Sequence, residues 1–384
     1  MTSRRAFLTR SLALGCSAAA SPLITPVTFA AAPGENRLVV IVLRGAMDGL
    51  DVVRPVGDPR LKGYRASLGK GDAAALTDFY GLHPALAPLM PLWNVGELSF
   101  AHAVSTPYRN KRSHFDGQDI LEAGVSGTDV GEDGWLNRAV SFLPGAHAET
   151  AFAVGRNTLR LMSGPNSVST WSPDSDLDLS PQAQLLLEKV YKQDPVFHQA
   201  AIKAQQLSDL TDDPMNPGRA ARAKPLASFA AGRLREDTRL AAFSINGWDT
   251  HANQDRALPR ALNELSTAIL ALKAELGPVW SKTAVLCLTE FGRTVRENGS
   301  RGTDHGTGGV AIFAGGALKG GRVLGKWPGL GVSDLYQDRD LMPTADVRSY
   351  AAWAMRALFP LSENDLESSV FPGLDMGDDP GLIT

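Results

Sequence analysis

Short apolar runs bounded by glycine or polar residues constrain the fold of this chain more than any other feature. None of the runs alternates apolar with polar residues, so each predicts a strand buried on both faces. Strands alternating with helical patterns over one length of chain favour a doubly wound α/β sandwich of three layers, with a mainly parallel central sheet. The runs are Leu38–Leu43, Leu98–Val104, Ala151–Val154, Leu240–Ile245, Thr283–Phe291 and Gly309–Ala314.

Segments with helical spacing lie between these runs, and the first of them follows a serine that suits a helix cap. We find no internal repeat and no long low-complexity linker, so we predict one domain over residues 33–384. The predicted helices are His114–Ala123 after Ser113, Pro181–Leu210, Pro259–Leu276 and Asp346–Phe359. Gly164–Asp178 and Thr211–Lys224 are predicted loops, interpreted as the edges of a small insert.

The first 32 residues have the pattern of a signal peptide. Arg4 and Arg5 precede the apolar stretch Leu12–Ala20, small residues follow at Phe29–Ala32, and no acidic residue occurs before Glu35. Adjacent arginines before an apolar stretch are typical of twin-arginine signals. We therefore predict the twin-arginine export machinery as a partner and the periplasm, or the exterior, as the location.

A membrane anchor is the alternative interpretation of this segment. Pro22 and Pro26 interrupt the apolar run well short of the ~20 residues that a spanning helix needs. Cys16 after Gly15 resembles a lipoprotein site, but Ala13 and Leu14 fit such a cleavage box poorly. We therefore expect no stable membrane anchor.

The charge balance limits which partners are expected, and the cysteine count limits what can stabilise the fold. The full chain has 38 basic and 41 acidic residues, and removing residues 1–32 takes away three arginines and no acid, which leaves a formal charge of −6. An acidic chain argues against nucleic acid or anionic lipid as the main partner. Cys287 is then the one remaining cysteine, so no internal disulfide is expected and the core alone must stabilise the fold.

Acidic and imidazole side chains follow the ends of three predicted strands and fill one glycine-rich loop. Because ligands bind beyond the carboxyl ends of strands in open α/β sheets, we expect these side chains to meet at one edge. Mixed carboxylate and imidazole ligands suit a divalent ion, namely Zn²⁺, Mn²⁺, Mg²⁺ or Ca²⁺, with one or two ions per chain. The predicted metal ligands are Asp48, Asp249, His251, Glu290, Asp304 and His305. Arg44 and Arg293 are candidates for binding a small anionic substrate, against the alternative of ordinary ion pairs.

Each of these candidate metal-binding segments also has a simpler interpretation. Asp48-Gly49 is compatible with a turn, and Asp249 with His251 is compatible with a capped helix start. Glu290 ends a buried strand and needs a partner or a metal. Asp304 and His305 lie among five glycines, more than an ordinary loop needs, so this backbone is expected to approach another segment closely.

Seven short motifs are spread along the chain: Arg44–Leu50, His83–Leu86, Arg112–Asp119, Gly134–Arg138, Gly247–His251, Thr289–Thr294 and Thr303–Gly306. They resemble, in the same order, those of the exported proteins called domain of unknown function 1501 (DUF1501). The resemblance covers nearly the whole of residues 33–384 but fixes no reaction.

The family in turn resembles a branch of the alkaline phosphatase-like superfamily, which includes sulfatases. That resemblance implies two divalent metals flanking a hydroxyl nucleophile at the start of a helix. Ser113 matches the nucleophile, and the implied ligands are Asp48, Asp249, His251, Glu290 and His305. His114 and Asp116 fall in a family motif and are candidates for contacting the metal ligands. His83, His102, His147 and His198 match no ligand pattern and are interpreted as structural.

Two departures from the superfamily pattern bear on the metal sites. Phe291 follows Glu290 where the superfamily usually has a histidine, and the spacing of Asp249 and His251 is tight. These departures predict that one metal site is depleted or lost. Ser113 also fits a simple helix cap as well as it fits a nucleophile.

Two hypotheses therefore remain open. The first is a metal-dependent hydrolase or transferase of phosphate- or sulfate-type esters that acts outside the cytoplasm. The second is a non-catalytic exported binding or assembly protein that retains the fold and a partial metal or anion site.

Overall fold

A nine-stranded sheet forms the centre of the protein, in the order β11-β5-β10-β9-β1-β8-β6-β7 with β14 added beside β5. The computed structural model describes residues 34–127, 131–155, 159–171 and 223–384. These belong to one compact unit, Ala32–Thr384. The strands are β1 (Arg37–Arg44), β5 (Leu98–Ser105), β6 (Ala151–Val154), β7 (Ser169–Trp171), β8 (Leu240–Asn246), β9 (Thr283–Thr289), β10 (Gly309–Ala314), β11 (Val323–Leu324) and β14 (Ala345–Asp346).

The sheet is mainly parallel, as predicted. Within the described ranges, β10 runs antiparallel to both of its neighbours, β5 and β9, while the other pairs are parallel. Two small sheets lie apart from it: β12 (Leu335–Tyr336) with β13 (Asp340–Leu341), and β2 (Val53–Arg54), β4 (Gly81–Leu82) and β3 (Ala74–Ala75).

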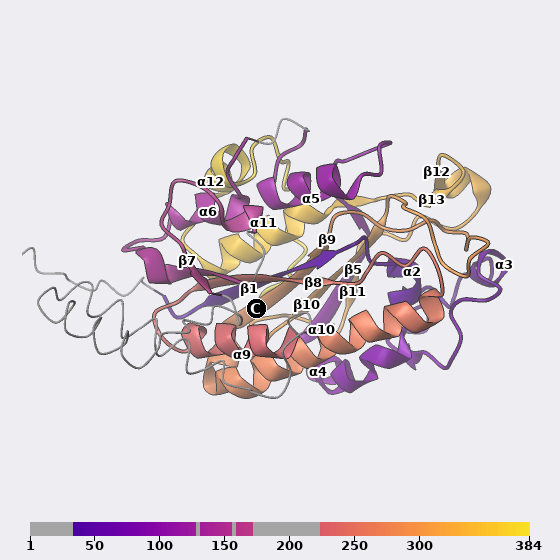
Figure 1. The fold of residues 1–384 in the computed structure, drawn as a ribbon, viewed down its shortest axis with the longest axis horizontal. Helices are drawn as coiled ribbons and strands as arrows, with labels where there is room; N and C mark the ends of the chain where they lie inside the picture. Colours follow the sequence, from indigo (N-terminus) through magenta and orange to yellow (C-terminus); the bar gives the residue numbers. More distant parts are fainter. Residues whose placement is uncertain (1–33, 128–130, 156–158, 172–222) are drawn as a thin grey trace, which may run out of the picture. The chain divides into compact units, whose positions relative to one another are not determined.

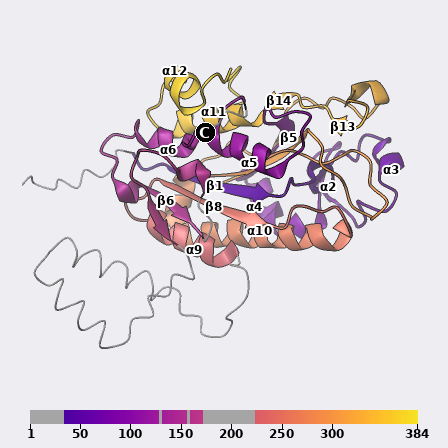
Figure 2. The same ribbon diagram turned by 45° about the horizontal axis from the view of Figure 1, so that its top comes forward.

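Helices cover both faces of the large sheet, so the fold has three layers (Figures 1 and 2). One face carries α4 (Met90–Asn94), α9 (Ala223–Leu234) and α10 (Gln254–Leu276). The other carries α5 (His114–Ala123), α6 (Trp135–Val140), α11 (Val347–Leu358) and α12 (Glu363–Asp365). Shorter helical segments are α2 (Gly49–Val52), α3 (Leu61–Tyr64), η1 (Pro84–Leu89), η2 (Ala148–Thr150), η3 (Arg160–Met162), η4 (Gly277–Lys282), η5 (Val332–Asp334) and η6 (Leu366–Val370).

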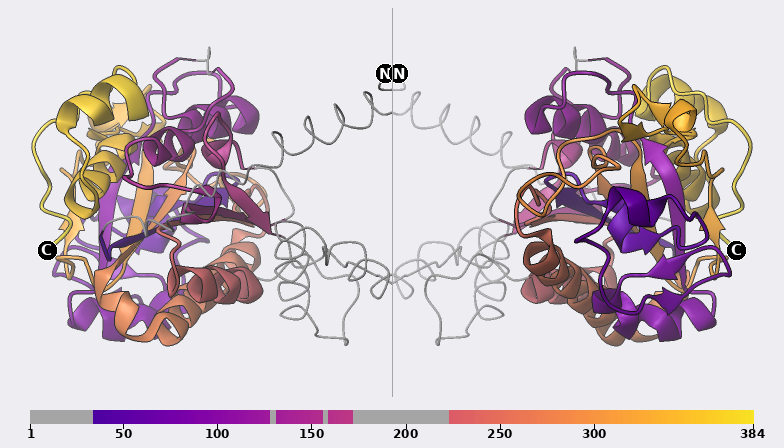
Figure 3. Two further views of the ribbon diagram at one scale, coloured as in Figure 1. Left: turned by 90° about the vertical axis from the view of Figure 1, so that its left-hand side faces the viewer. Right: turned by 90° about the vertical axis from the view of Figure 1, so that its right-hand side faces the viewer.

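The core is divided between the two faces by the alternation of strand side chains. On β1, Val39, Ile41 and Leu43 pack in the core with α9 and α10. Leu38 and Val40 point the other way, into the core with α6 and α11. Each fully buried aliphatic side chain contributes about 1.5–3 kcal/mol. Because both faces are covered, the strands are apolar throughout, which is why the sequence showed runs without alternation. The end-on views of Figure 3 show the sheet between the two helical layers.

Most predicted elements are confirmed within two residues, and the exceptions have tertiary causes. Helix α10 begins at Gln254, ahead of the predicted Pro259, because the buried Gln254 side chain is anchored to Thr250, Thr303 and Asp48. The predicted loop Gly164–Asp178 contains the edge strand β7, which pairs with β6. The predicted helix Pro181–Leu210, nearly all of Thr211–Lys224, and His198 lie outside the described residues.

Candidate metal centre

Three imidazoles and one carboxylate from distant parts of the chain converge at one edge of the sheet. His114 begins α5 after β5, Asp249 and His251 follow β8, and His305 lies ahead of the antiparallel β10. Asp249 Oδ1 lies 3.5 Å from His114 Nε2, 3.1 Å from His251 Nε2 and 3.4 Å from His305 Nε2. The Nε2 atoms of His251 and His305 are 2.9 Å apart. Of these four, His114, Asp249 and His305 form a group whose potential ligand atoms all lie within 4.8 Å of one another.

Each imidazole is anchored through its other nitrogen. The Nδ1 atom of His114 lies 2.9 Å from Glu290 Oε1, and that of His251 lies 3.1 Å from Asp304 Oδ1. The Nδ1 atom of His305 lies 2.7 Å from the carbonyl oxygen of Arg112. Carboxylate and carbonyl oxygens only accept hydrogen bonds, so each Nδ1 carries the hydrogen. The lone pair of each Nε2 is then left for the shared centre, which is how outer-shell groups orient metal-binding histidines.

These facing lone pairs repel one another unless a proton or a metal ion lies between them. His114 Nε2 is buried and has no hydrogen-bond partner. A tetrahedral Zn²⁺ ion holds imidazole nitrogens at about 2.0–2.1 Å, which puts neighbouring ligand atoms about 3.4 Å apart. The separations of 3.4–3.5 Å from Asp249 Oδ1 to the Nε2 atoms of His305 and His114 therefore fit one bound metal ion, whereas His251 lies outside the group whose ligand atoms are all within 4.8 Å of one another.

Glu290 is among the predicted ligands, but the structure uses it to orient others. It is fully buried, and its Oε1 accepts from Gly45 N, His114 Nδ1 and Gln118 Nε2 at 2.9–3.1 Å. Burial by itself raises the pKa of Glu290, but the hydrogen bonds, led by that from His114, outweigh it and lower the pKa. The pKa of His114 is raised, mainly by the hydrogen bond to Glu290.

Asp304 has the same orienting geometry toward His251. Its Oδ1 also accepts from Asn298 Nδ2 at 3.0 Å, and this bond is the main cause of the lowered pKa of Asp304. The glycine-rich loop lies tightly against the site, as expected. A Cβ at Gly302 would collide with the backbone of His251, and one at Gly306 with that of Arg293.

Asp48 is not brought into the cluster, which corrects the sequence prediction. Its two oxygens accept from Arg65 NH1 and NH2 at 2.6 and 3.0 Å, and Oδ2 also accepts from Gln254 Nε2 at 2.6 Å. Both side chains of this ion pair are almost fully buried. Asp48 is therefore the counter-ion of a buried arginine.

The two arginines expected to bind an anion are also engaged by the protein. Arg293 is buried and donates to the carbonyls of Gly45, Ala46, Trp248 and Thr303, and its NH2 lies 2.5 Å from Asp249 Oδ1. Arg44 pairs with Glu122 at 2.6 Å and donates to Gln118 at 2.6 Å. Arg293 thus holds Asp249 in place, and its hydrogen bond and charge more than offset burial and lower the pKa of Asp249.

Ser113 caps α5, with its Oγ accepting from Asp116 N at 3.4 Å. Its neighbours in sequence, Arg112 and His114, both contact the centre, so the capped turn borders the site. The Asp116 carboxylate accepts a hydrogen bond from the hydroxyl of Tyr108 at 3.3 Å.

The sequence predicts His114 only as a group that contacts the ligands, yet the structure places it in the cluster itself. Its position directly after a cap within a family motif was the available signal. The ring of Phe291 stacks on it at 5.4 Å between centroids. His83, His102 and His147, which we interpret from the sequence as structural, each accept a backbone hydrogen bond through Nδ1.

Comparison with known proteins settles the family. The family described as "Protein of unknown function (DUF1501)" matches residues 77–366. This chain belongs to the DUF1501 family. No curated protein matches it.

Several solved structures resemble this DUF1501 protein at low identity. An alkaline phosphatase from the Antarctic bacterium TAB5 is 11% identical, with a TM-score of 0.36 over 73% of this chain and 92% of that one. A lipoteichoic acid synthase from Listeria monocytogenes is 10% identical, with a TM-score of 0.40 over 92% and 78%. The C-terminal periplasmic domain of EcEptC from Escherichia coli, in complex with Zn, is 10% identical, with a TM-score of 0.41 over 92% and 93%.

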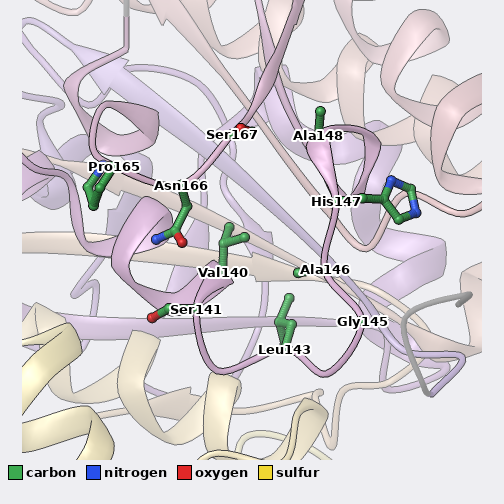
Figure 4. A pocket seen from close by; sticks show the side chains of 10 residues that line it. All are labelled: Val140, Ser141, Leu143, Gly145, Ala146, His147, Ala148, Pro165, Asn166 and Ser167. Atoms are coloured by element: carbon green, nitrogen blue, oxygen red, sulfur yellow. The ribbon is translucent and has the colours of Figure 1, made fainter. Parts of the chain in front are cut away.

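A separate cavity of about 590 Å³ lies between the end of α6 and residues 165–167 (Figure 4). Its lining includes Val140, Leu143, His147 and Asn166, and it shares no residue with the metal cluster.

Proposed function

We propose that this DUF1501 protein is an exported, metal-dependent hydrolase or transferase of phosphate- or sulfate-type esters. The observation that carries the proposal is the set of imidazoles anchored through Nδ1, whose Nε2 atoms face the oxygen of Asp249. His114, Asp249 and His305 would hold the ion, with His251 as a further ligand. A divalent ion held there would act as a Lewis acid and lower the pKa of a nearby hydroxyl or water.

The protein's own groups prepare this chemistry. Glu290, Asp304 and the carbonyl of Arg112 fix the imidazole tautomers, so each Nε2 is available as a ligand. Because Ser113 Oγ accepts in the helix cap, its hydroxyl hydrogen stays available for transfer. The first turn of α5 adds positive potential where a transferred anion would accumulate. Ser113 is therefore our candidate nucleophile.

The test is hydrolysis of phosphomonoester, phosphodiester and sulfate ester substrates by the full chain. We expect turnover that is lost after chelation, restored by Zn²⁺ or Mn²⁺, and absent in His305→Ala. His147→Asn is the matched control, because asparagine keeps the cap at that distant helix start. Turnover that survives both chelation and His305→Ala would contradict a metal-dependent mechanism.

A non-catalytic binding or assembly role is the second candidate, and the arginines favour it. Arg44 and Arg293 both donate to protein carboxylates, so neither is free to clamp a substrate anion. A protein that binds metal tightly but hydrolyses no ester of the panel would support this role.

Export is part of the proposal and rests on the twin-arginine pattern at Arg4 and Arg5. In the described part of the chain, no helix combines the length and apolar character required to cross a bilayer.

A further inference from the structure

We infer that the centre binds a single transition-metal ion of the zinc class, and that Arg293 supplies the positive charge that a second ion would otherwise bring. The inference rests on the metal site of the proposed function. It concerns the number and kind of ions, which can be measured without any turnover.

The donor set selects the kind of ion. Three of the four groups around the centre are imidazoles, and imidazole suits Zn²⁺ and its neighbours, whereas Mg²⁺ and Ca²⁺ prefer oxygen ligands. Glu290 and Asp304 carry the carboxylates that would suit those harder ions. Each instead accepts a hydrogen bond from an imidazole Nδ1, Glu290 from His114 and Asp304 from His251.

The charges favour one divalent ion over two. Asp249, Glu290 and Asp304 bring three negative charges, and Arg293 bonded to Asp249 brings one positive charge. Arg112 and Arg339 share Asp340 beside His305 and add one further positive charge. With neutral imidazoles, one negative charge remains, so one divalent ion would leave one positive charge in excess, whereas two would leave three.

Two of the groups beside the candidate centre, Arg293 and Phe291, cannot bind a metal ion. The Arg293 side chain is fully buried, and its NH2 lies 2.5 Å from Asp249 Oδ1, the same atom that the imidazoles surround. On another side, the apolar ring of Phe291 lies 5.4 Å from the rings of both His114 and His305. Asp249 Oδ1, the oxygen that a second ion would have to share, therefore already accepts a hydrogen bond from a guanidinium.

Metal titration of the full chain tests the inference. Protein stripped with a chelator would be titrated with Zn²⁺ or Co²⁺, and the ions retained after gel filtration in a weak chelator would be counted by mass spectrometry. We expect one equivalent per chain, an intense visible Co²⁺ spectrum of the tetrahedral type, and no displacement by excess Mg²⁺ or Ca²⁺. Two retained equivalents, none, or displacement by Mg²⁺ would overturn the inference.

Variants assign the retained ion to this centre. His305→Ala should lose it, and Glu290→Gln should weaken its binding by about 10–100-fold, the usual effect of an outer-shell change. His147→Asn should retain one equivalent with unchanged affinity. An ion retained equally by His305→Ala would place it elsewhere and overturn the assignment. This inference and the proposed function can fail separately. A protein that retains two ions and hydrolyses esters would contradict only this inference. A protein that retains one ion and hydrolyses no ester would contradict only the proposed function.

Discussion

Replacing Asp48 by asparagine separates the role that its motif suggests from the role that its contacts show. The substitution keeps the size of the side chain but removes the charge opposite Arg65. The Arg65 side chain is 3% exposed and that of Asp48 is 1% exposed, so the remaining guanidinium stays out of water. Arg65 also donates to the carbonyls of Thr294 and Val295 at 2.9 and 3.0 Å, which prevent it from swinging into solvent.

The expected loss is large for these reasons. Removing one partner of a buried ion pair costs about 3–5 kcal/mol, because the other charge is left buried and uncompensated. We therefore expect Asp48→Asn to lower the free energy of unfolding by that amount. Its affinity for Zn²⁺, measured below the unfolding transition, should stay near that of the unchanged protein.

Urea denaturation followed by tryptophan fluorescence gives the stability, and Zn²⁺ titration gives the affinity. The double variant Asp48→Asn with Arg65→Gln is the control, because removing both charges leaves no buried charge uncompensated and should recover part of the lost stability. Loss of Zn²⁺ binding in Asp48→Asn, with a stability change below about 1 kcal/mol as for an exposed pair, would refute the ion-pair interpretation. Asp48 would then be a metal ligand after all.

Three further predictions concern pH, the helix cap and export. Burial lowers the pKa of His102 to about 4 from its ordinary 6.5. As the pH is lowered, the unfolded chain therefore gains a proton before the native protein does. The free energy of unfolding should fall by up to about 3 kcal/mol as the pH drops from 6.5 to 4. His102→Gln should remove that part of the pH dependence, and an unchanged slope in urea denaturation would contradict it. Ser113→Ala should cost about 1 kcal/mol as a lost cap; ester turnover that persists in it would exclude Ser113 as nucleophile. Replacing Arg4 and Arg5 by lysine should leave the precursor in the cytoplasm, and undiminished periplasmic accumulation would point to another export route.

The sequence alone was sufficient for six strands of the large sheet (β1, β5, β6, β8, β9 and β10), the helix α5 with its Ser113 cap, and the edge where the site lies. These are local properties: apolar runs report burial on both faces, and the side chains that follow parallel strands must meet at their carboxyl ends. The positions of Asp249 and His251, directly after β8, followed from that rule, whereas His305 lies in the glycine-rich loop ahead of the antiparallel β10. The family motifs added ancestry, which the match over residues 77–366 confirms.

Only the tertiary structure decided what each charged side chain does at that edge. Glu290, Asp48 and Arg293 have the residue types of ligands and anion clamps, yet each is satisfied by a group far away in sequence: Glu290 by His114, Asp48 by Arg65, and Arg293 by Asp249. A buried charge must find a partner, and which partner it finds depends on packing that no local pattern encodes. His114 became a candidate ligand for the same reason, because the carboxylate that anchors its Nδ1 turns its Nε2 toward the centre.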